Sequence, residues 1–208
     1  MIKKIGIILA LIGVTITVNA QSDCETNYAI YRHEYKQKNY EEALVSWRKV
    51  FNECPEYNEN TFVNGSRIIT YQIKKDNDSK GAYLDTLMMI YDQRISFIED
   101  SIFSGRKTKV LGSKGVDILR YYPDKYIEAY HILRESIDGE GNAASSLSLI
   151  SYFKALVQYE RNSKDFTKKD VLDAYIDVSE IIEYNLENNE KYAKNYQNSL
   201  IKIENWFA

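Results

Sequence analysis

The stretch "YKQKNYEEALVSWRKVFNECP", residues 35–55, decides the fold of this 208-residue chain. Tyr40, Ala43 and Trp47 recur in it at three- and four-residue spacing, which places them on one face of a helix. A small residue such as Ala43 lets two helices cross closely, and bulky rings about one turn away fill the space beside the crossing. Cys54-Pro55 then breaks the pattern. The stretch therefore predicts the end of one helix, a turn and a second helix packed on the first.

Helical spacing continues through the rest of the chain, and no sustained alternation of apolar and polar residues indicates a strand. One apolar stripe runs from Leu84 to Ile98, and a second runs from Val171 to Leu186 behind Thr167, a good N-cap residue. With only two prolines and nine glycines, the composition favours long helices. We expect helices near residues 24–37, 40–53, 59–75, 81–100, 109–121, 124–137, 143–161, 167–187 and 190–206.

The breaks between these helices are short, which suits antiparallel neighbours. They fall at residues 54–55, 74–81, 103–108, 123–124 and 138–142. The predicted fold class is therefore all-α: an α-solenoid of about four antiparallel helical hairpins plus a C-terminal helix.

Residues 24–55 resemble a tetratricopeptide repeat. In that family's pattern, Tyr40 is the aromatic residue that starts the second helix, Ala43 the small residue of the close contact, Trp47 the next aromatic and Pro55 the terminal proline. The resemblance implies that Ile30 and Tyr35 face inward from the first helix of the hairpin.

A second copy of the pattern begins at residue 121. Tyr126, Glu128 and Ala129 repeat the spacing of Tyr40, Glu42 and Ala43. The small residues Ala43, Thr86 and Ala129 are 43 positions apart, and Ala174 follows 45 positions later. This spacing predicts four related hairpins with a longer period than the family's usual one.

The first twenty residues have the pattern of a secretory leader. Lys3 and Lys4 form a basic start, residues 5–18 are apolar, and "VNA" at 18–20 suits cleavage before Gln21. The apolar run is shorter than the roughly 20 residues of a membrane-spanning helix, and Asp23 argues against lipidation of Cys24. We therefore expect a signal peptide at 1–20, a helical repeat domain at 21–208, and no integral membrane segment after cleavage.

Together with this leader, the repeat resembles exported tetratricopeptide-repeat proteins of the Bacteroidota type. The resemblance implies a scaffold in the periplasm or cell envelope of a Gram-negative bacterium that binds a protein or peptide partner. It carries over no catalytic residue and no cofactor.

Cys24 and Cys54 are the chain's two cysteines. In an antiparallel hairpin, the start of the first helix lies beside the end of the second, where these residues fall. An exported chain meets oxidising conditions, so we expect a Cys24–Cys54 disulfide. The alternative is two separate thiols. A catalytic thiol is disfavoured because the chain lacks a CxxC motif.

No other pattern predicts an enzyme or a metal site. His33 and His131 lack the spacing of a zinc site, and residues 76–81, "DNDSKG", match only the first half of a calcium loop, so we interpret them as a polar turn. The net charge of −3, or −5 without Lys3 and Lys4, does not favour nucleic-acid binding. The glycines at 112–115 and 138–142 lack the strand-to-helix setting of a phosphate loop.

The chain has a surplus of tyrosines, 18 in all. Those beyond what the helix stripes require either fill the core or line a binding groove, and the pattern leaves both readings open. They are Tyr71, Tyr121, Tyr122, Tyr152, Tyr159, Tyr184, Tyr192 and Tyr196.

Two further functions stay open beside the peptide-binding scaffold. One is a glycan-binding outer-membrane protein built on similar repeats. The other is the recognition domain of a larger enzyme whose C-terminal part is missing, because the apolar pattern runs to Trp206 and Phe207 without a polar cap.

Overall fold

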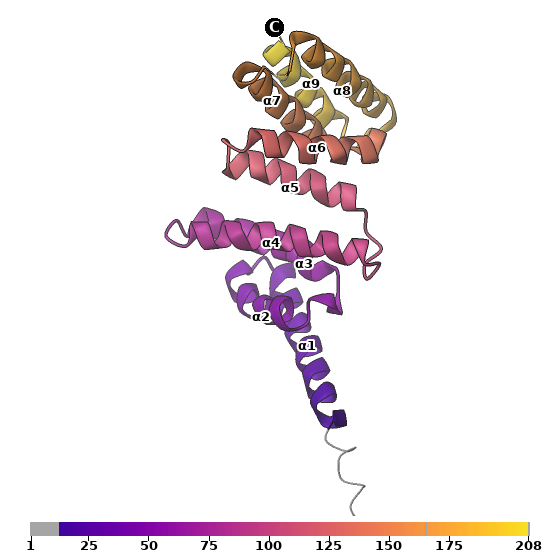
Figure 1. Ribbon diagram of the computed structural model, residues 1–208. Coiled ribbons are helices and arrows are strands. Elements are labelled where there is room, and N and C mark those ends of the chain that lie inside the picture. The colour runs from indigo at the N-terminus through magenta and orange to yellow at the C-terminus, as the bar shows by residue number, and fades with distance from the viewer. Residues whose placement is uncertain (1–12, 165, 208) are drawn as a thin grey trace, which may run out of the picture. The chain divides into compact units, whose positions relative to one another are not determined.

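The computed structural model describes residues 13–164 and 166–207, with side chains for 23–164 and 166–206 (Figure 1). All regular structure in this part of the chain is helical, which confirms the predicted all-α class. The elements are α1 (Gly13–Lys36), α2 (Tyr40–Glu53), η1 (Pro55–Tyr57), α3 (Asn60–Lys75), α4 (Lys80–Glu99), α5 (Lys107–Tyr121), α6 (Tyr126–Glu140), η2 (Gly141–Ala143), α7 (Ser146–Asn162), α8 (Lys168–Asn188) and α9 (Ala193–Phe207).

Apart from the start of α1, the predicted helix boundaries lie within about three residues of the observed ones. Helix α1 begins at Gly13 rather than near residue 24, and residues 1–12 of the predicted leader lie outside the described residues. Helix α6 continues to Glu140, where the pattern predicts a loop from 138. The Glu140 carboxylate is only 4% exposed, because it pairs with Arg106 (Nη2 to Oε2, 2.8 Å) and accepts from the Thr108 hydroxyl. These tertiary contacts hold the last turn in helical form.

The chain divides into two compact units, Met1–Arg94 and Ile95–Ala208, with the boundary inside α4. In the first unit, α1 and α2 form an antiparallel hairpin, and α3 packs on α2. The buried Trp47 ring stacks on Phe51, with centroids 4.9 Å apart. Its indole Nε1–H donates to the Thr61 carbonyl oxygen at 2.7 Å. Trp47 thus ties α2 to the start of α3.

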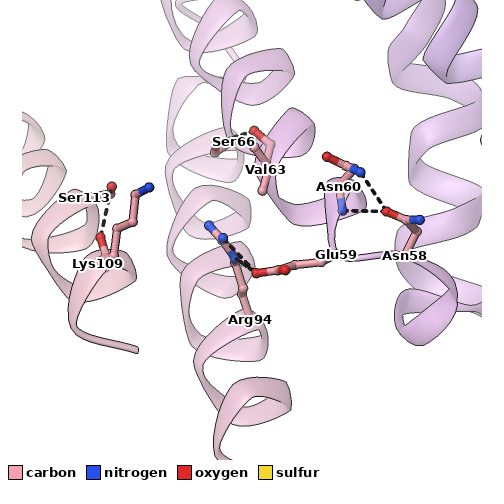
Figure 2. A network of polar contacts seen from close by, with 8 residues as sticks. All are labelled: Asn58, Glu59, Asn60, Val63, Ser66, Arg94, Lys109 and Ser113. Carbon is pink, nitrogen blue, oxygen red and sulfur yellow. Dashed lines mark hydrogen bonds and ion pairs between the residues drawn. The ribbon is translucent and has the colours of Figure 1, made fainter. Parts of the chain in front are cut away.

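Gly65 makes a close approach of α3 to α2 possible. A Cβ atom at this position would lie 2.6 Å from three atoms of the Trp47 indole. On the far side of α3, the Arg94 guanidinium of α4 donates to the Glu59 carboxylate from Nε (3.1 Å) and Nη2 (2.8 Å), as Figure 2 shows. The same view shows Asn58 Oδ1 accepting from the Asn60 backbone and side chain at the entry to α3. These contacts fix the entry to α3.

In the second unit, α5 and α6 lie side by side as an antiparallel pair (Figure 1), and α7 packs on both. Gly115 lets α5 approach α6, since a Cβ there would lie 2.6 Å from Leu133 Cγ. Helices α8 and α9 pack on each other and on α7. Tyr196 of α9 donates to the Ala144 carbonyl oxygen at 2.9 Å, which connects the end of the chain to the start of α7.

Helix α8 begins as its sequence predicts. Thr167 is the N-cap, its side chain accepts from the Asp170 backbone, and the Asp170 carboxylate accepts from the Thr167 backbone. The apolar stripe behind it is buried at Ala174, Val178 and Ile182. The earlier stripe is likewise buried at Leu84, Leu87 and Tyr91.

The predicted packing residues divide into three groups. Ala43, Trp47 and Ala129 are fully buried. Tyr35, Tyr40, Pro55 and Tyr126 are half-buried. The prediction for Ile30 is wrong: its side chain is 46% exposed, and the neighbouring Tyr31 is 0% exposed instead. Helix α1 is therefore rotated by about one residue from the predicted register, because the large Tyr31 ring occupies the interior.

Among the described residues, no helix combines the length and the apolar character that crossing a membrane requires.

Candidate functional site

Cys24 and Cys54 meet at the open end of the first hairpin. Their Sγ atoms lie 2.14 Å apart and their Cα atoms 6.2 Å apart, so the structure joins them as a disulfide and confirms the predicted pairing. The bond connects α1 to the C-cap of α2. Because both thiols are used, neither can act as a nucleophile in this state.

The candidate binding site is an open cavity of about 390 Å³ in the first unit. It lies where the first turn of α2, the last turn of α3 and the loop after α3 come together. Its lining is polar and mostly charged: Glu41, Gln72, Lys75, Asp76, Asn77 and Asp78. The volume is at the lower end of the range for small-ligand sites, roughly 300 to 1,000 Å³.

Two lining residues, Glu41 and Lys75, belong to a three-residue polar network with Tyr71. The Glu41 carboxylate accepts from the Tyr71 hydroxyl at 3.1 Å and pairs with the Lys75 ammonium. The hydrogen bond from Lys75, then that from Tyr71, holds the pKa of the Glu41 carboxyl below its usual value. The same contacts raise the pKa values of Lys75 and Tyr71. Glu41 and Lys75 therefore remain oppositely charged across the neutral range and neutralise each other.

Another part of the lining is the turn between α3 and α4. Asp76 Oδ1 accepts from the backbone N–H groups of Asp78 (3.0 Å) and Ser79 (3.1 Å). These bonds, that of Ser79 foremost, lower the pKa of the Asp76 carboxyl. The predicted polar turn is thus present at residues 76–79. No group of three or more potential metal ligands occurs in the part of the chain that the structure describes.

Gln72 is the most buried residue of the cavity lining. Its side chain is only 5% exposed, and its Nε2 has no hydrogen-bond partner among the described residues. A buried amide donor without an acceptor is costly. The unpaired Nε2 lies beneath the surface of the cavity lining, so this polar atom is a local cost to the fold.

A row of tyrosines leads to Glu41 of the cavity lining. The rings of Tyr35 and Tyr40 lie 5.7 Å apart, and those of Tyr40 and Tyr71 lie 5.4 Å apart. Arg67 donates to the Tyr35 hydroxyl at 2.9 Å, which fixes the outer end of the row. Since Tyr71 also bonds Glu41, the aromatic row leads directly to the charged lining.

The tyrosines of the second unit mainly build its core. Tyr130 stacks on Tyr152 with centroids 5.4 Å apart and meets the edges of Tyr159 and Phe166. Burial, and secondarily Tyr152, raises the pKa of the Tyr130 phenol to about 12. The Arg134 guanidinium donates to the Tyr152 hydroxyl at 3.1 Å. This cluster is structural.

The surplus tyrosines therefore divide between the two readings that the sequence leaves open. Tyr152, Tyr159 and Tyr196 are buried, Tyr121 and Tyr122 are half-buried, and Tyr71, Tyr184 and Tyr192 are exposed. Among these exposed tyrosines, Tyr71 donates a hydrogen bond from its hydroxyl to Glu41, a residue of the cavity lining.

The histidines and glycines that the sequence analysis considers for metal or phosphate binding lie apart from one another. His33 is exposed on α1 beside Gln37, and His131 is exposed on α6 against Tyr130 and Tyr159. The glycines at 112 and 115 are packing residues, with Ser136 and Leu133 respectively against them. The sequence pattern does not assign Glu41 and residues 72–78 to one site. Residues 76–78, Asp-Asn-Asp, indicate an acidic turn, but their proximity to Glu41 depends on how α2 and α3 pack.

Comparison with protein-family models, with curated proteins and with solved structures yields no match to this chain.

Proposed function

We propose that the chain is an exported, non-enzymatic scaffold of the tetratricopeptide-repeat type that binds a protein or peptide partner in the periplasm or cell envelope of a Gram-negative bacterium. The observation that carries the proposal is the first hairpin. Ala43 and Trp47 occupy buried positions at the helix crossing, and a disulfide closes the hairpin ends, as suits a protein of an oxidising compartment.

A second observation supports binding rather than a purely structural role. The polar cavity of the first unit adjoins a row of partly exposed tyrosines, and tyrosine is favoured at protein interfaces because it combines apolar area with a hydrogen-bonding group. Stable helical hairpins with such a face suit recognition of a peptide segment.

Affinity capture from a cell-envelope extract tests the proposal. The bait is the exported chain, purified without reductant, and the captured material is identified by mass spectrometry and by glycan staining. We expect a protein that is enriched over the same experiment with heat-denatured bait. Enrichment of glycans without protein would support the glycan-binding alternative and contradict the proposal.

The predicted export has a test of its own. The N-terminal peptide of the protein recovered from the cell envelope should begin at Gln21, after removal of residues 1–20. An N-terminal peptide that begins at Met1 would contradict export through this leader.

A further inference from the structure

We infer that the exposed side of α3 next to α1 binds an acidic peptide segment, with Arg67 as the residue that pairs with a carboxylate of that segment. This surface, the α1–α3 face, consists of Tyr35, Val63, Arg67, Tyr71 and Lys74. The inference rests on the proposed function, because it assumes a peptide partner. It gives that partner a chemical class and a place of contact.

Four residues of the α1–α3 face lie in line on one side of α3. Val63, Arg67, Tyr71 and Lys74 follow one another at steps of four, four and three residues, the spacing of neighbours on a helix surface. Val63 is 41% exposed and Tyr71 is 36% exposed, and Arg67 and Lys74 are exposed as well. This side of α3 is therefore open to a partner.

Helix α1 and the start of α2 supply aromatic surface beside this line. Arg67 Nη1 donates to the Tyr35 hydroxyl at 2.9 Å, and the ring of Tyr40 lies 5.4 Å from that of Tyr71. Tyrosine rings thus accompany α3 over the turn from Arg67 to Tyr71. A segment bound here would meet ring surface and the apolar Val63 as well as charge.

The charge of the α1–α3 face is basic. Helix α3 has no aspartate or glutamate, and none of the ion pairs in the described part of the chain uses Arg67 or Lys74. Two carboxylates of the neighbouring helices are already engaged: Glu34 accepts from a side-chain amide at 2.8 Å, and Glu41 pairs with Lys75. Two cations beside apolar surface are complementary to an acidic segment.

Arg67 is the anchor of the proposed contact because its side chain is already oriented. Its bond to Tyr35 uses a single Nη1–H group, and a guanidinium has five such donors. A guanidinium matches a carboxylate with two parallel hydrogen bonds, and a side chain that is held in place loses less conformational freedom on binding. Lys74 can add a second and weaker pair.

The spacing of the two cations sets the length of the segment. Arg67 and Lys74 are seven residues apart on the helix, which is about 10 Å along its axis. An extended peptide covers that distance in about three residues. Two acidic residues three positions apart, with an apolar residue between them, therefore fit the α1–α3 face. A long polyanion does not, because the face offers two cations on a chain with a net charge of −3.

Peptide titration into the ¹⁵N-labelled exported chain, purified without reductant and followed by backbone amide chemical shifts, tests the inference. The probe is the capped hexapeptide acetyl-Gly-Glu-Leu-Ala-Glu-Gly-amide. Its comparisons are a version with glutamine at both glutamate positions, a version with lysine there, and trigalacturonate as an acidic sugar.

We expect the glutamate peptide to bind at least about fivefold more tightly than the glutamine peptide, and less tightly as salt is added. The lysine peptide and trigalacturonate should bind more weakly than the glutamate peptide. The largest shift changes should fall within residues 34–40 and 63–75.

The decisive variant is Arg67→Gln with Lys74→Gln. Both positions are exposed and glutamine is a good helix former, so the two charges are removed while α3 is preserved. We expect binding of the glutamate peptide to weaken by at least about fivefold. The matched control, Lys154→Gln with Arg161→Gln, removes the same residue types at the same spacing from exposed positions of α7 and should leave binding unchanged. Far-UV circular dichroism and the Tm of each variant show that it is folded.

A third variant tests whether Tyr35 acts by orienting Arg67. Tyr35→Phe keeps the ring that packs on Tyr40 and removes the hydroxyl that accepts from Arg67. It should weaken binding by about twofold to threefold in the wild-type background and have no effect in the Arg67→Gln background. Equal effects in both backgrounds would contradict a role of Tyr35 through Arg67.

Four results would overturn the inference: no binding of the glutamate peptide, equal affinities for the glutamate and glutamine peptides, no effect of the Arg67 and Lys74 changes, or largest shift changes in the second unit. Trigalacturonate that binds as tightly as the glutamate peptide would also overturn it, in favour of an acidic glycan.

Affinity capture separates this inference from the proposed function. If the Arg67→Gln and Lys74→Gln variant captures the same protein as well as wild type does, the proposed function stands and this site is wrong. If wild type captures no protein, the proposed function itself fails.

Discussion

In each unit a glycine allows two helices to approach closely, but the side chain that faces the glycine differs. In the first unit, Gly65 faces the indole of Trp47, and in the second, Gly115 faces the isobutyl group of Leu133. Trp47 is a rigid ring held by a hydrogen bond to Thr61 and by stacking on Phe51. Leu133 is an aliphatic side chain that forms no hydrogen bond, and it is 0% exposed. The first crossing is therefore held by a hydrogen bond and ring stacking and the second by aliphatic packing alone, so we expect the first to be the more fixed and the second the more adaptable.

Covalent closure also distinguishes the two units. The chain's two cysteines are both in the first unit, where they close the terminal hairpin. The second unit relies on ring packing around Tyr130 and on side chains that tie α9 to α7. The unit with the candidate binding cavity is thus the one whose hairpin is closed by a covalent bond.

Trp47→Ala should have the largest effect. Removal of a fully buried indole leaves a cavity and also breaks the bond to Thr61, so we expect a loss of about 3 to 5 kcal/mol in the free energy of unfolding. Urea unfolding followed by far-UV circular dichroism measures it. The control is Val45→Ala on the same helix, where the side chain is 65% exposed and the change should stay within about 0.5 kcal/mol. Similar losses in the two variants would contradict the role of Trp47.

Removal of the disulfide should come next. Cys24→Ser with Cys54→Ser opens a loop with a sequence separation of 30, for which chain entropy predicts a loss of about 3 to 4 kcal/mol. Urea unfolding of the variant and of the wild type, with and without reductant, gives the measurement. The variant should be insensitive to reductant. Wild type that is equally stable in both conditions would show that the pairing does not support the fold.

Alanine substitution of the two glycines compares the two helix crossings directly, through the loss in the free energy of unfolding. Gly65→Ala should destabilise the protein by about 1 to 3 kcal/mol, because the new methyl group meets the indole, which cannot move aside. Gly115→Ala should cost less, because the aliphatic side chain of Leu133 yields more readily than a ring held by a hydrogen bond. The gain of alanine in helix propensity, about 0.5 to 1 kcal/mol, is the same at both positions. Parallel urea titrations measure the difference. An equal or larger loss for Gly115→Ala would contradict the distinction between a fixed and an adaptable crossing.

A smaller effect is expected at the start of α8. Thr167→Ala removes the N-cap acceptor and should cost about 1 kcal/mol. Thermal unfolding checks it, and Thr167→Ser, which keeps the hydroxyl, should retain most of the stability. An alanine variant as stable as wild type would show that this cap is dispensable.

The smallest effect concerns pH at the same cap. The hydrogen bond from Thr167 lowers the pKa of the Asp170 carboxyl in the folded protein. Its contribution to stability is therefore present above the unfolded value of about 3.9 and lost as the pH falls through the folded value. Asp170→Asn should lower the urea midpoint at neutral pH, and the difference from wild type should shrink below about pH 3. A difference that is constant with pH would exclude ionisation of Asp170 as its cause.

Local patterns in the sequence were sufficient to predict most of the helical architecture. Apolar spacing and the cap at Thr167 place α8, and the hairpin arrangement leads to the Cys24–Cys54 pair. These features depend on neighbours within a few residues or on one simple hairpin. They did not require knowledge of how distant helices pack.

The predictions that differ from the structure depend on long-range packing. Ile30 and Tyr31 are adjacent and both apolar, so which one faces inward depends on the space that the neighbouring helices leave for a large ring. Helix α6 extends to Glu140 because Arg106 and Thr108, more than thirty positions earlier, bind that side chain. The cavity has the same origin, since Glu41 meets residues 72–78 only after α2 and α3 pack.

The most direct measurement of the central claim is what the exported chain, purified without reductant, captures from a cell-envelope extract. The account predicts a protein that is enriched over the same experiment with heat-denatured bait. Capture of no protein, or of glycans without protein, would contradict it.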